Sequence, residues 1–356
     1  MLEWFLDNGS NHAPSTNFAM DLVNLIVVIA FVLTNAALVY FIIRYRRRSD
    51  NDVTSRKANS HTIEVIWTTI PSIVFLGLYV VGLQGFMGLR AVAADAREIN
   101  VWAKQWAWEF QYPASLREDT SKKSPLKSYN KLYLEANRPV KLIMKSHDVI
   151  HSFSVPDFRV KEDVVGHIYT YTTFTPLISP RQKAMTADQR KERSRLTEAQ
   201  QEKIPQMADE CLNYEPGTCA TYNIFCTEYC GNDHSYMLAK AIVLTPEHFK
   251  AKMAELEEAS NNISPDMGQQ IYNSAGCKSC HSIDGSRVVG PSFKGLYGTE
   301  RPIEGGTKVV ADENYIRESI LNPGAKIHEG FPNLMPPQDL SDEQIESVIL
   351  FFKTLK

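Results

Sequence analysis

Residues 226–237 read Cys226-Thr227-Glu228-Tyr229-Cys230-Gly231-Asn232-Asp233-His234-Ser235-Tyr236-Met237. Two thiols, an imidazole and a thioether therefore lie close together in the chain. Copper binds this mixture of sulfur and imidazole ligands well, whereas a structural zinc site uses only Cys and His and has no role for Met237. Two bridging thiolates would hold two copper ions close together, with one His on each ion and the thioether as a weak ligand. The stretch favours a copper centre for electron transfer.

The Cys pair also has a simpler interpretation. Cys226 and Cys230 would form a disulfide, or pack as small apolar residues, because short Cys pairs in exported domains are often structural. The spacing alone leaves both interpretations open.

The stretch resembles the copper-A loop of subunit II of the haem-copper cytochrome c oxidases at every ligand spacing. That family has one more ligand, a His in an upstream Asp-Val-(Ile/Leu)-His-Ser-aromatic segment, which here is Asp148-Val149-Ile150-His151-Ser152-Phe153. The resemblance implies a dinuclear copper site whose ligands are His151, Cys226, Glu228, Cys230, His234 and Met237. Glu228 would contribute its backbone carbonyl, and its side chain would face a magnesium site shared with subunit I. His147 is then not a ligand.

Two long apolar runs lie within the first ninety positions, at residues 22–43 and at about 65–87. At about 1.5 Å per residue, each run is long enough to cross a hydrocarbon core of about 30 Å. Two buried helices of a soluble protein are the alternative, although such long uncharged runs are uncommon there. The sequence predicts a transmembrane hairpin within residues 1–90, with helices at about 20–43 and 64–87.

The loop between these runs is basic and contains Arg44, Arg46, Arg47, Arg48, Arg56 and Lys57. The positive-inside tendency puts this loop in the cytoplasm, so the N-terminal tail and everything after residue 90 lie outside. Residues 1–20 contain no Lys or Arg, so no cleavable signal peptide is expected. The net charge of -3 does not suggest a nucleic-acid partner.

Glu64 precedes the second apolar run in the sequence Glu64-Val65-Ile66-Trp67-Thr68. A Glu at this place is often a solvated first-turn residue that suits the helix dipole. The segment also resembles the start of the second helix of oxidase subunit II. That resemblance implies that Glu64 lies at the cytoplasmic mouth of a proton path into subunit I.

After residue 90 the pattern changes to short runs rich in Val, Ile, Tyr and Thr at residues 98–102, 131–135, 140–144 and 165–173. Such runs, separated by turn residues, predict strands of an all-β Greek-key sandwich. The family resemblance narrows this to a cupredoxin-like copper-A domain at residues 91–245. We expect the copper loop at one end of that domain.

Three Trp residues lie close together at Trp102, Trp106 and Trp108. Alternation along one strand would put all three on one face, as a core stripe. In the oxidase family, the equivalent of Gln105-Trp106 supplies a surface Trp through which electrons enter from cytochrome c, which makes Trp106 the candidate. The family usually has an aromatic residue where this chain has Ala107.

A charged insert at about residues 176–221 separates His151 from the copper loop. Its run of Arg190, Lys191, Arg193 and Arg195 is typical of a solvated helix or loop, and a contact with another subunit or a donor is the alternative. Cys211 and Cys219 near its end are expected to form a disulfide, with free thiols as the alternative. Residues 246–262 then form a charged, helix-favouring linker.

Residues 263–356 begin with Ser264-Pro265-Asp266, a helix N-terminus with an N-cap and a Pro in the first turn. The sequence Cys277-Lys278-Ser279-Cys280-His281 follows, a specific motif for covalent haem c attachment. In that motif the thiols of Cys277 and Cys280 bind the haem and His281 binds the iron. Ser341 is expected to cap the final helix.

The surrounding residues resemble an all-α class I cytochrome c. Gly290-Pro291 resembles the loop that supports the proximal His, and Asn333-Leu334-Met335-Pro336 resembles the distal Met loop. Met335 is then the sixth iron ligand, a pairing that raises the haem potential. His328 is the competing ligand.

Together these resemblances indicate a multidomain subunit II of a caa-type cytochrome c oxidase, in a bacterial inner membrane with both redox domains on the periplasmic side. They imply membrane lipids, oxidase subunit I with haem a, and subunit III as partners. A cytochrome c or a quinol-oxidising complex would be the donor. The alternatives are a membrane-tethered electron carrier outside any oxidase, a nitrous oxide or nitric oxide reductase relative, and a copper-insertion protein.

Overall fold

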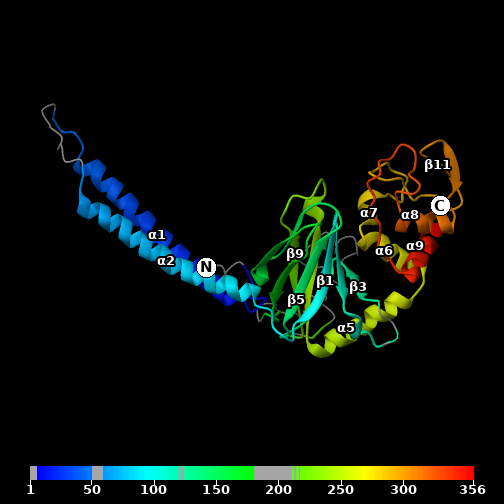
Figure 1. Cartoon of the computed structure of the whole chain (residues 1–356), viewed down its shortest axis with the longest axis horizontal. Coiled ribbons are helices and arrows are strands. Elements are labelled where there is room, and N and C mark those ends of the chain that lie inside the picture. Colours follow the sequence, from blue (N-terminus) through cyan, green and yellow to red (C-terminus); the bar gives the residue numbers. More distant parts are fainter. Residues whose placement is uncertain are drawn as a thin grey trace, which may run out of the picture.

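A computed structural model describes residues 6–49, 59–119, 121, 124–179, 211, 214–215 and 217–356. Its three parts follow one another along the longest axis of the molecule, as Figure 1 shows: a helical hairpin, a β-sandwich and a helical C-terminal part. This is the order of fold classes that the sequence predicts.

Two long apolar helices form the hairpin, α1 (Ala13–Arg44) and α2 (His61–Arg90). Both are long and apolar enough to cross a membrane, and the apolar windows within them bury no residue against the rest of the protein. Apolar side chains that cover a helix on all sides require an apolar surrounding, which lipid provides. The helices extend beyond the predicted spans at both ends.

The segment before α1 packs against the sandwich. Gly9 donates a backbone hydrogen bond to Asp157 at 3.0 Å, and the Ser10 hydroxyl donates to the Phe158 carbonyl at 2.7 Å. A Cβ on Gly9 would lie 2.6 Å from the Phe158 ring, so only Gly fits this approach. The N-terminal segment and the sandwich therefore lie at the same end of the hairpin, as the charge of the hairpin loop predicts.

Two five-stranded sheets form the sandwich. The first has the order β3 (Leu126–Tyr129), β2 (Ala107–Tyr112), β1 (Arg97–Lys104), β5 (Val140–Ser146) and β8 (Thr170–Phe174). The second has the order β4 (Lys131–Glu135), β10 (Leu238–Leu244), β9 (Cys219–Cys226), β6 (His151–Val155) and β7 (Val160–Val164). Short 3-10 turns lie at Ala114–Leu116 and Pro156–Phe158.

The predicted strands at 98–102, 131–135 and 140–144 are present, but the prediction for residues 165–173 is partly wrong. Strand β8 begins only at Thr170, and the preceding residues connect it to β7. Two pairs of neighbouring strands are parallel, β1 with β5 and β4 with β10. The strands of these pairs are not consecutive in the chain, so the chain crosses to the other sheet before each pair forms.

The core stripe predicted for the three Trp residues is also wrong. A tight turn at Gln105–Trp106 separates β1 from β2, and Ala103 pairs with Trp108 across it. Trp102 and Trp108 consequently point to opposite faces of the sheet. Trp108 is fully buried, whereas Trp102 stacks on His147 with ring centroids 4.6 Å apart. The prediction assumed that residues 102–108 form one continuous strand. The turn at residues 105–106 instead places Trp102 and Trp108 on two strands whose side chains alternate independently.

The predicted linker forms a helix, α5 (Pro246–Asn261), which packs on the sandwich. Phe249 and Met253 from α5 belong to the sandwich core, and Arg97 lies over the Phe249 ring at 4.5 Å. Farther along, Glu257 pairs with Arg117 at 3.2 Å. Apolar and charged contacts together fix the direction in which the chain leaves the copper domain.

The C-terminal part comprises α6 (Pro265–Ser274), α7 (Cys277–Cys280), α8 (Glu313–Leu321), α9 (Asp342–Thr354) and a small hairpin of β11 (Glu300–Ile303) and β12 (Thr307–Val310). Both predicted caps are confirmed: Ser264 accepts from Met267, and Ser341 forms a capping box with Gln344. The β11–β12 hairpin was not predicted. Its turn contains Gly305 and Gly306, both in the left-handed region.

Cys211 and Cys219 form the predicted disulfide. Most of the charged insert before them, including its Arg and Lys run, lies outside the described residues. Its predicted conformation therefore stays a prediction.

Tyr112 links two parts of the core, because its buried hydroxyl accepts the backbone N–H of Tyr133 at 2.7 Å. A Tyr112→Phe variant removes the acceptor of this buried hydrogen bond and should destabilise the sandwich by about 1–3 kcal/mol. Denaturant unfolding of the detergent-solubilised chain, followed by Trp fluorescence, measures the change. The matched control is Tyr169→Phe, whose side chain is 63% exposed and which should unfold like the wild type.

Candidate copper and haem sites

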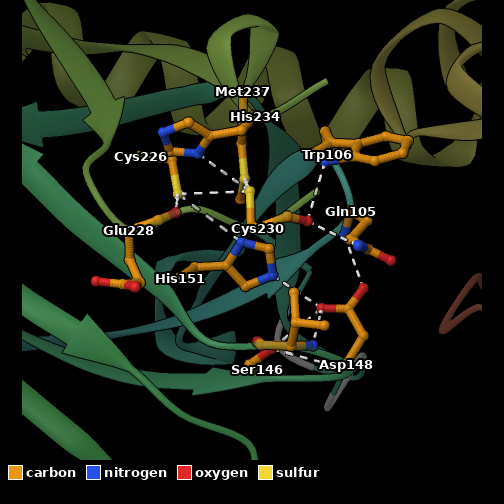
Figure 2. A network of polar contacts seen from close by, with 11 residues as sticks. Gln105, Trp106, Ser146, Asp148, His151, Cys226, Glu228, Cys230, His234 and Met237 are labelled. Carbon is orange, nitrogen blue, oxygen red and sulfur yellow. Dashed lines mark hydrogen bonds and ion pairs between the residues drawn. The ribbon is translucent and has the colours of Figure 1, made fainter. Parts of the chain in front are cut away.

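Strand ends bring the copper-ligand candidates together. Cys226 is the last residue of β9, and Cys230, His234 and Met237 follow in the loop and short turn before β10. His151 begins β6, which pairs with β9 through Phe153 and Cys226. Figure 2 shows these side chains converging from the two strands on one place.

The two thiols lie side by side, with Cys226 Sγ and Cys230 Sγ 3.8 Å apart. A disulfide requires an S–S distance of about 2.05 Å, so the predicted alternative of a bond between them is not what the structure forms. Their Sγ atoms and a ring nitrogen of His151 all lie within 4.8 Å of one another. The three residues form a cluster able to hold a metal.

The other candidates surround this pair. His151 Nδ1 lies 3.9 Å from Cys226 Sγ, and His234 Nδ1 lies 3.4 Å from Cys230 Sγ. The Met237 sulfur lies 3.7 Å from Cys230 Sγ, and the Glu228 carbonyl oxygen lies 3.3 Å from Cys226 Sγ. Each thiol therefore has a different histidine, which is the arrangement that two bridged metal ions need.

The thiol pair is buried and electrostatically coupled. Burial acts to raise the pKa of Cys226, but hydrogen bonds with His151 and nearby backbone groups outweigh it and lower this pKa. Burial raises the pKa of Cys230, and the neighbouring Cys226 charge raises it further. Two thiolates at this separation repel each other, so a cation between them is needed for both to be charged.

Asp148 orients His151. The Nε2–H of His151 donates to Asp148 at 2.8 Å, which leaves Nδ1 directed at Cys226. The backbone N–H groups of Gln105 and Val149 hold the carboxylate, at 2.7 Å each. Burial alone would raise the pKa of Asp148, but these donors and the His151 contact lower it. The sequence predicts no role for Asp148, although it lies three residues before the ligand candidate His151.

Of the other residues considered from the sequence, Trp106 contacts the copper loop, whereas the Glu228 carboxylate and His147 lie outside the cluster. Trp106 donates its ring N–H to the Cys230 carbonyl at 3.2 Å, and Gln105 donates to the same oxygen at 2.7 Å. The Glu228 carboxylate is exposed and points away from the thiols in Figure 2. His147 stacks on Trp102 instead of joining the cluster, in agreement with the sequence analysis.

The haem attachment motif forms one helical turn, α7, with both thiols free. The His281 ring stacks on Phe293 at 4.3 Å and donates its Nδ1–H to the Pro291 carbonyl at 2.7 Å. Nε2 is therefore the nitrogen left for iron. A Cβ on Gly290 would lie 2.5 Å from this ring, so Gly is needed beside it. Burial lowers the pKa of His281 and favours the neutral form that binds metal.

The two candidates for the sixth iron ligand lie apart from His281. Met335 is half-buried in an irregular segment before α9, and no interaction among the described residues joins it directly to His281. His328 contacts the Glu329 carbonyl at 2.9 Å through Nδ1 and lies against Phe331.

Glu64 lies in the first turn of α2, at the end of the hairpin far from the sandwich. Its carboxylate is 3.9 Å from His61 Nδ1, and its side chain is 47% exposed. The structure does not bring Glu64 near the copper or haem residues.

Comparison with known proteins gives a separate family match for each of three ranges of the chain. Residues 4–84 match the family described as "Cytochrome C oxidase subunit II, transmembrane domain", and residues 98–177 match "Cytochrome C oxidase subunit II, periplasmic domain". The chain belongs to the cytochrome c oxidase subunit II family. Residues 266–356 match the family described as "Cytochrome c", which gives this subunit II a fused cytochrome c domain.

Two relatives match this chain over most of its length. Cytochrome c oxidase subunit 2 of Alkalihalophilus pseudofirmus is 26% identical over 93% of this chain and 85% of the relative. That of Bacillus subtilis is 22% identical over 93% and 86%. The solved periplasmic domain of subunit II from Bradyrhizobium japonicum covers 47% of this chain and 98% of that chain, at 18% identity and a TM-score of 0.31.

This subunit II is accordingly part of an oxidoreductase complex. Its family implies copper, and its fused domain implies haem c. The residues present fit both groups. Buried thiols, imidazoles and a thioether converge at the copper end, while two free thiols and an oriented imidazole lie at the haem end.

The two histidines near the copper loop offer a matched test of the ligand assignment. A His151→Ala variant should lose copper, because it removes the imidazole whose Nδ1 lies 3.9 Å from Cys226 Sγ. His147→Ala should retain it, since His147 contacts Trp102 instead. The ratio of copper to haem in the purified protein measures both. Equal copper contents in the two variants would contradict the assignment of His151.

Proposed function

We propose that this subunit accepts electrons from an external donor at haem c, passes them to a dinuclear copper-A centre, and delivers them to haem a of subunit I. Oxygen reduction and proton translocation would then take place in subunit I. The observation that carries the proposal is the pair of buried, unbonded thiols with a different histidine on each.

Each residue of the copper end has a distinct task. The thiolates of Cys226 and Cys230 would bridge the two ions, and His151 and His234 would hold one ion each. Met237 and the Glu228 carbonyl would complete the coordination. When bound, the copper pair and haem c supply one-electron transfer and no other chemistry. Asp148 holds the His151 ring in place, so the frame changes little when the charge of the site changes.

Trp106 is the proposed route of entry into the copper end. Its indole N–H reaches the Cys230 carbonyl, and Figure 2 shows its ring extending away from the thiols. The ring therefore connects the copper loop with the outer side of the β1–β2 turn. An electron arriving there has a short covalent and hydrogen-bonded path to Cys230.

Two further assignments concern the partners of the subunit. The exposed Glu228 carboxylate supports a magnesium site shared with subunit I, because its oxygens could bind an ion that a second chain also binds. Glu64 is proposed at the cytoplasmic mouth of a proton path, with the basic hairpin loop on the same side. Subunit III would complete the complex, and a cytochrome c or a quinol-oxidising complex would be the donor.

The experiment that tests the function is a rapid-reduction measurement on the purified oxidase complex. Electrons delivered to haem c should reach the copper absorption next and haem a afterwards. Trp106→Leu should slow the step from haem c to copper without changing the copper spectrum. Trp102→Leu is the control, because Trp102 contacts His147 and not the copper loop. Reduction of haem a that bypasses copper would exclude the proposed order.

The sixth iron ligand is tested separately. Met335→Leu conserves side-chain volume but removes the sulfur, so the low-spin, Met-ligated haem spectrum should disappear. His328→Ala should leave that spectrum unchanged. Optical spectra of the oxidised protein decide between the two, and survival of the Met-ligated spectrum in Met335→Leu would assign the ligand elsewhere.

A further inference from the structure

The β1–β2 turn contacts both redox ends of the protein. On one side, Gln105 and Trp106 donate to the Cys230 carbonyl. On the other side lies Gly276, the residue before the first haem-binding Cys. A Cβ built on Gly276 would be 3.6 Å from the Ala107 Cβ and 4.0 Å from the Gln105 carbonyl oxygen. The haem attachment helix therefore begins directly against the turn.

Small residues make this approach possible. Gly276 adopts a φ of +87°, a conformation that favours glycine. Ala107 faces it with only a methyl group, at the position where the family resemblance leads us to expect an aromatic ring. A large side chain at 107 would occupy the space into which the haem domain packs.

Lys104 connects the turn to the Met335 segment. Its ammonium donates to the Gln338 side-chain oxygen at 2.6 Å, and the Gln338 amide donates to the Pro336 carbonyl at 2.7 Å. Pro336 directly follows Met335. Two hydrogen bonds thus join the end of β1 to the residue next to the proposed iron ligand.

Lys127 on β3 makes a second connection to the same segment. Its ammonium lies 2.6 Å from the Asp339 carboxylate and 3.4 Å from Glu109, and it also donates to the Asp339 backbone carbonyl. Gln111 donates to both carboxylates, at 3.2 Å to Asp339 and 2.7 Å to Glu109. The copper domain thereby holds Asp339 at its side chain and at its backbone.

These contacts are buried on the side of the copper domain, whereas the Asp339 side chain is 64% exposed. The Lys127 side chain is 11% exposed and that of Glu109 is 4% exposed, and Lys104 is buried as well. Exposed ion pairs contribute little, whereas a buried charge that loses its partner is strongly disfavoured. Lys127 faces Glu109 of its own domain and Asp339 of the cytochrome c domain, so separating the domains removes one of its two carboxylate partners.

We propose that Lys104, Lys127, Gln338 and Asp339 form an interdomain latch that holds the cytochrome c domain over the β1–β2 turn. Lys104 and Lys127 are positioning residues: they fix where the haem domain lies and take no part in electron transfer themselves. The inference rests on the proposed function, because it assigns the latch to the step from haem c to copper.

The test uses the full chain in its oxidase complex, loaded with haem and copper. Lys104→Met removes the contact with Gln338, Asp339→Asn removes the negative charge that faces Lys127, and the double variant combines the two changes. Asp339 is 64% exposed at its side chain, so its substitution should not prevent folding. The matched control is Lys308→Met with Glu300→Gln, an exposed pair within the cytochrome c domain itself.

Two readouts are needed. Pulsed EPR measures the distance distribution between ferric haem c and oxidised copper-A, and rapid reduction measures the rate of transfer between them. The double variant should broaden the distribution and lower the docked fraction and the transfer rate by about tenfold. The optical spectrum of haem c and the EPR spectrum of copper-A should stay unchanged in all variants.

A conservative variant separates positioning from folding. Lys104→Arg keeps a charged donor and should retain most of the wild-type rate of transfer from haem c to copper. The control pair should behave like the wild type. A double variant with the wild-type distance distribution and a rate within about twofold of wild type would overturn the latch. Absence of transfer from haem c to copper in the wild type would instead overturn the proposed function.

Discussion

The burial of two unbonded thiols side by side is the constraint on which the copper end depends. Cys226 and Cys230 cannot both be charged at 3.8 Å without a cation between them, and a different histidine lies beside each thiol. The pairing of β6 with β9 brings His151 to this place, and Asp148 fixes its ring. The sandwich thus brings the proposed copper ligands to one place.

Contacts of the sandwich with the N-terminal segment and with α5 position the copper site relative to the hairpin and to the haem domain. The N-terminal segment is hydrogen-bonded to the sandwich at Asp157 and Phe158. The hairpin is therefore joined to the copper domain before α1 by these contacts, and after α2 by the chain itself. Helix α5 packs along the sandwich through Phe249 and Met253 and leads the chain to the haem domain. The basic loop at the far end of the hairpin places the copper site on the opposite side of the membrane from Glu64.

The convergence of His151, Cys226, Cys230 and His234 was predictable from sequence because these residues lie in two short motifs whose residue types specify the chemistry. Helix caps at Ser264 and Ser341 were predictable for the same reason, since capping is local. The Trp stripe failed because a turn at residues 105–106 changes the alternation. Contacts such as Lys104 with Gln338 join residues more than two hundred positions apart, and no local pattern indicates them. The contact of Asp148 with His151 differs from these long-range contacts, because the two residues lie three positions apart in the same motif.

The central claim is that Cys226 and Cys230 bridge two copper ions that share one unpaired electron. Low-temperature EPR with a copper count, on the full chain loaded with copper and haem, tests it most directly. We predict two copper ions per chain and a hyperfine pattern from one electron coupled equally to both nuclei. A single copper ion with an ordinary mononuclear pattern, or no bound copper, would contradict the account and leave a membrane-anchored cytochrome c.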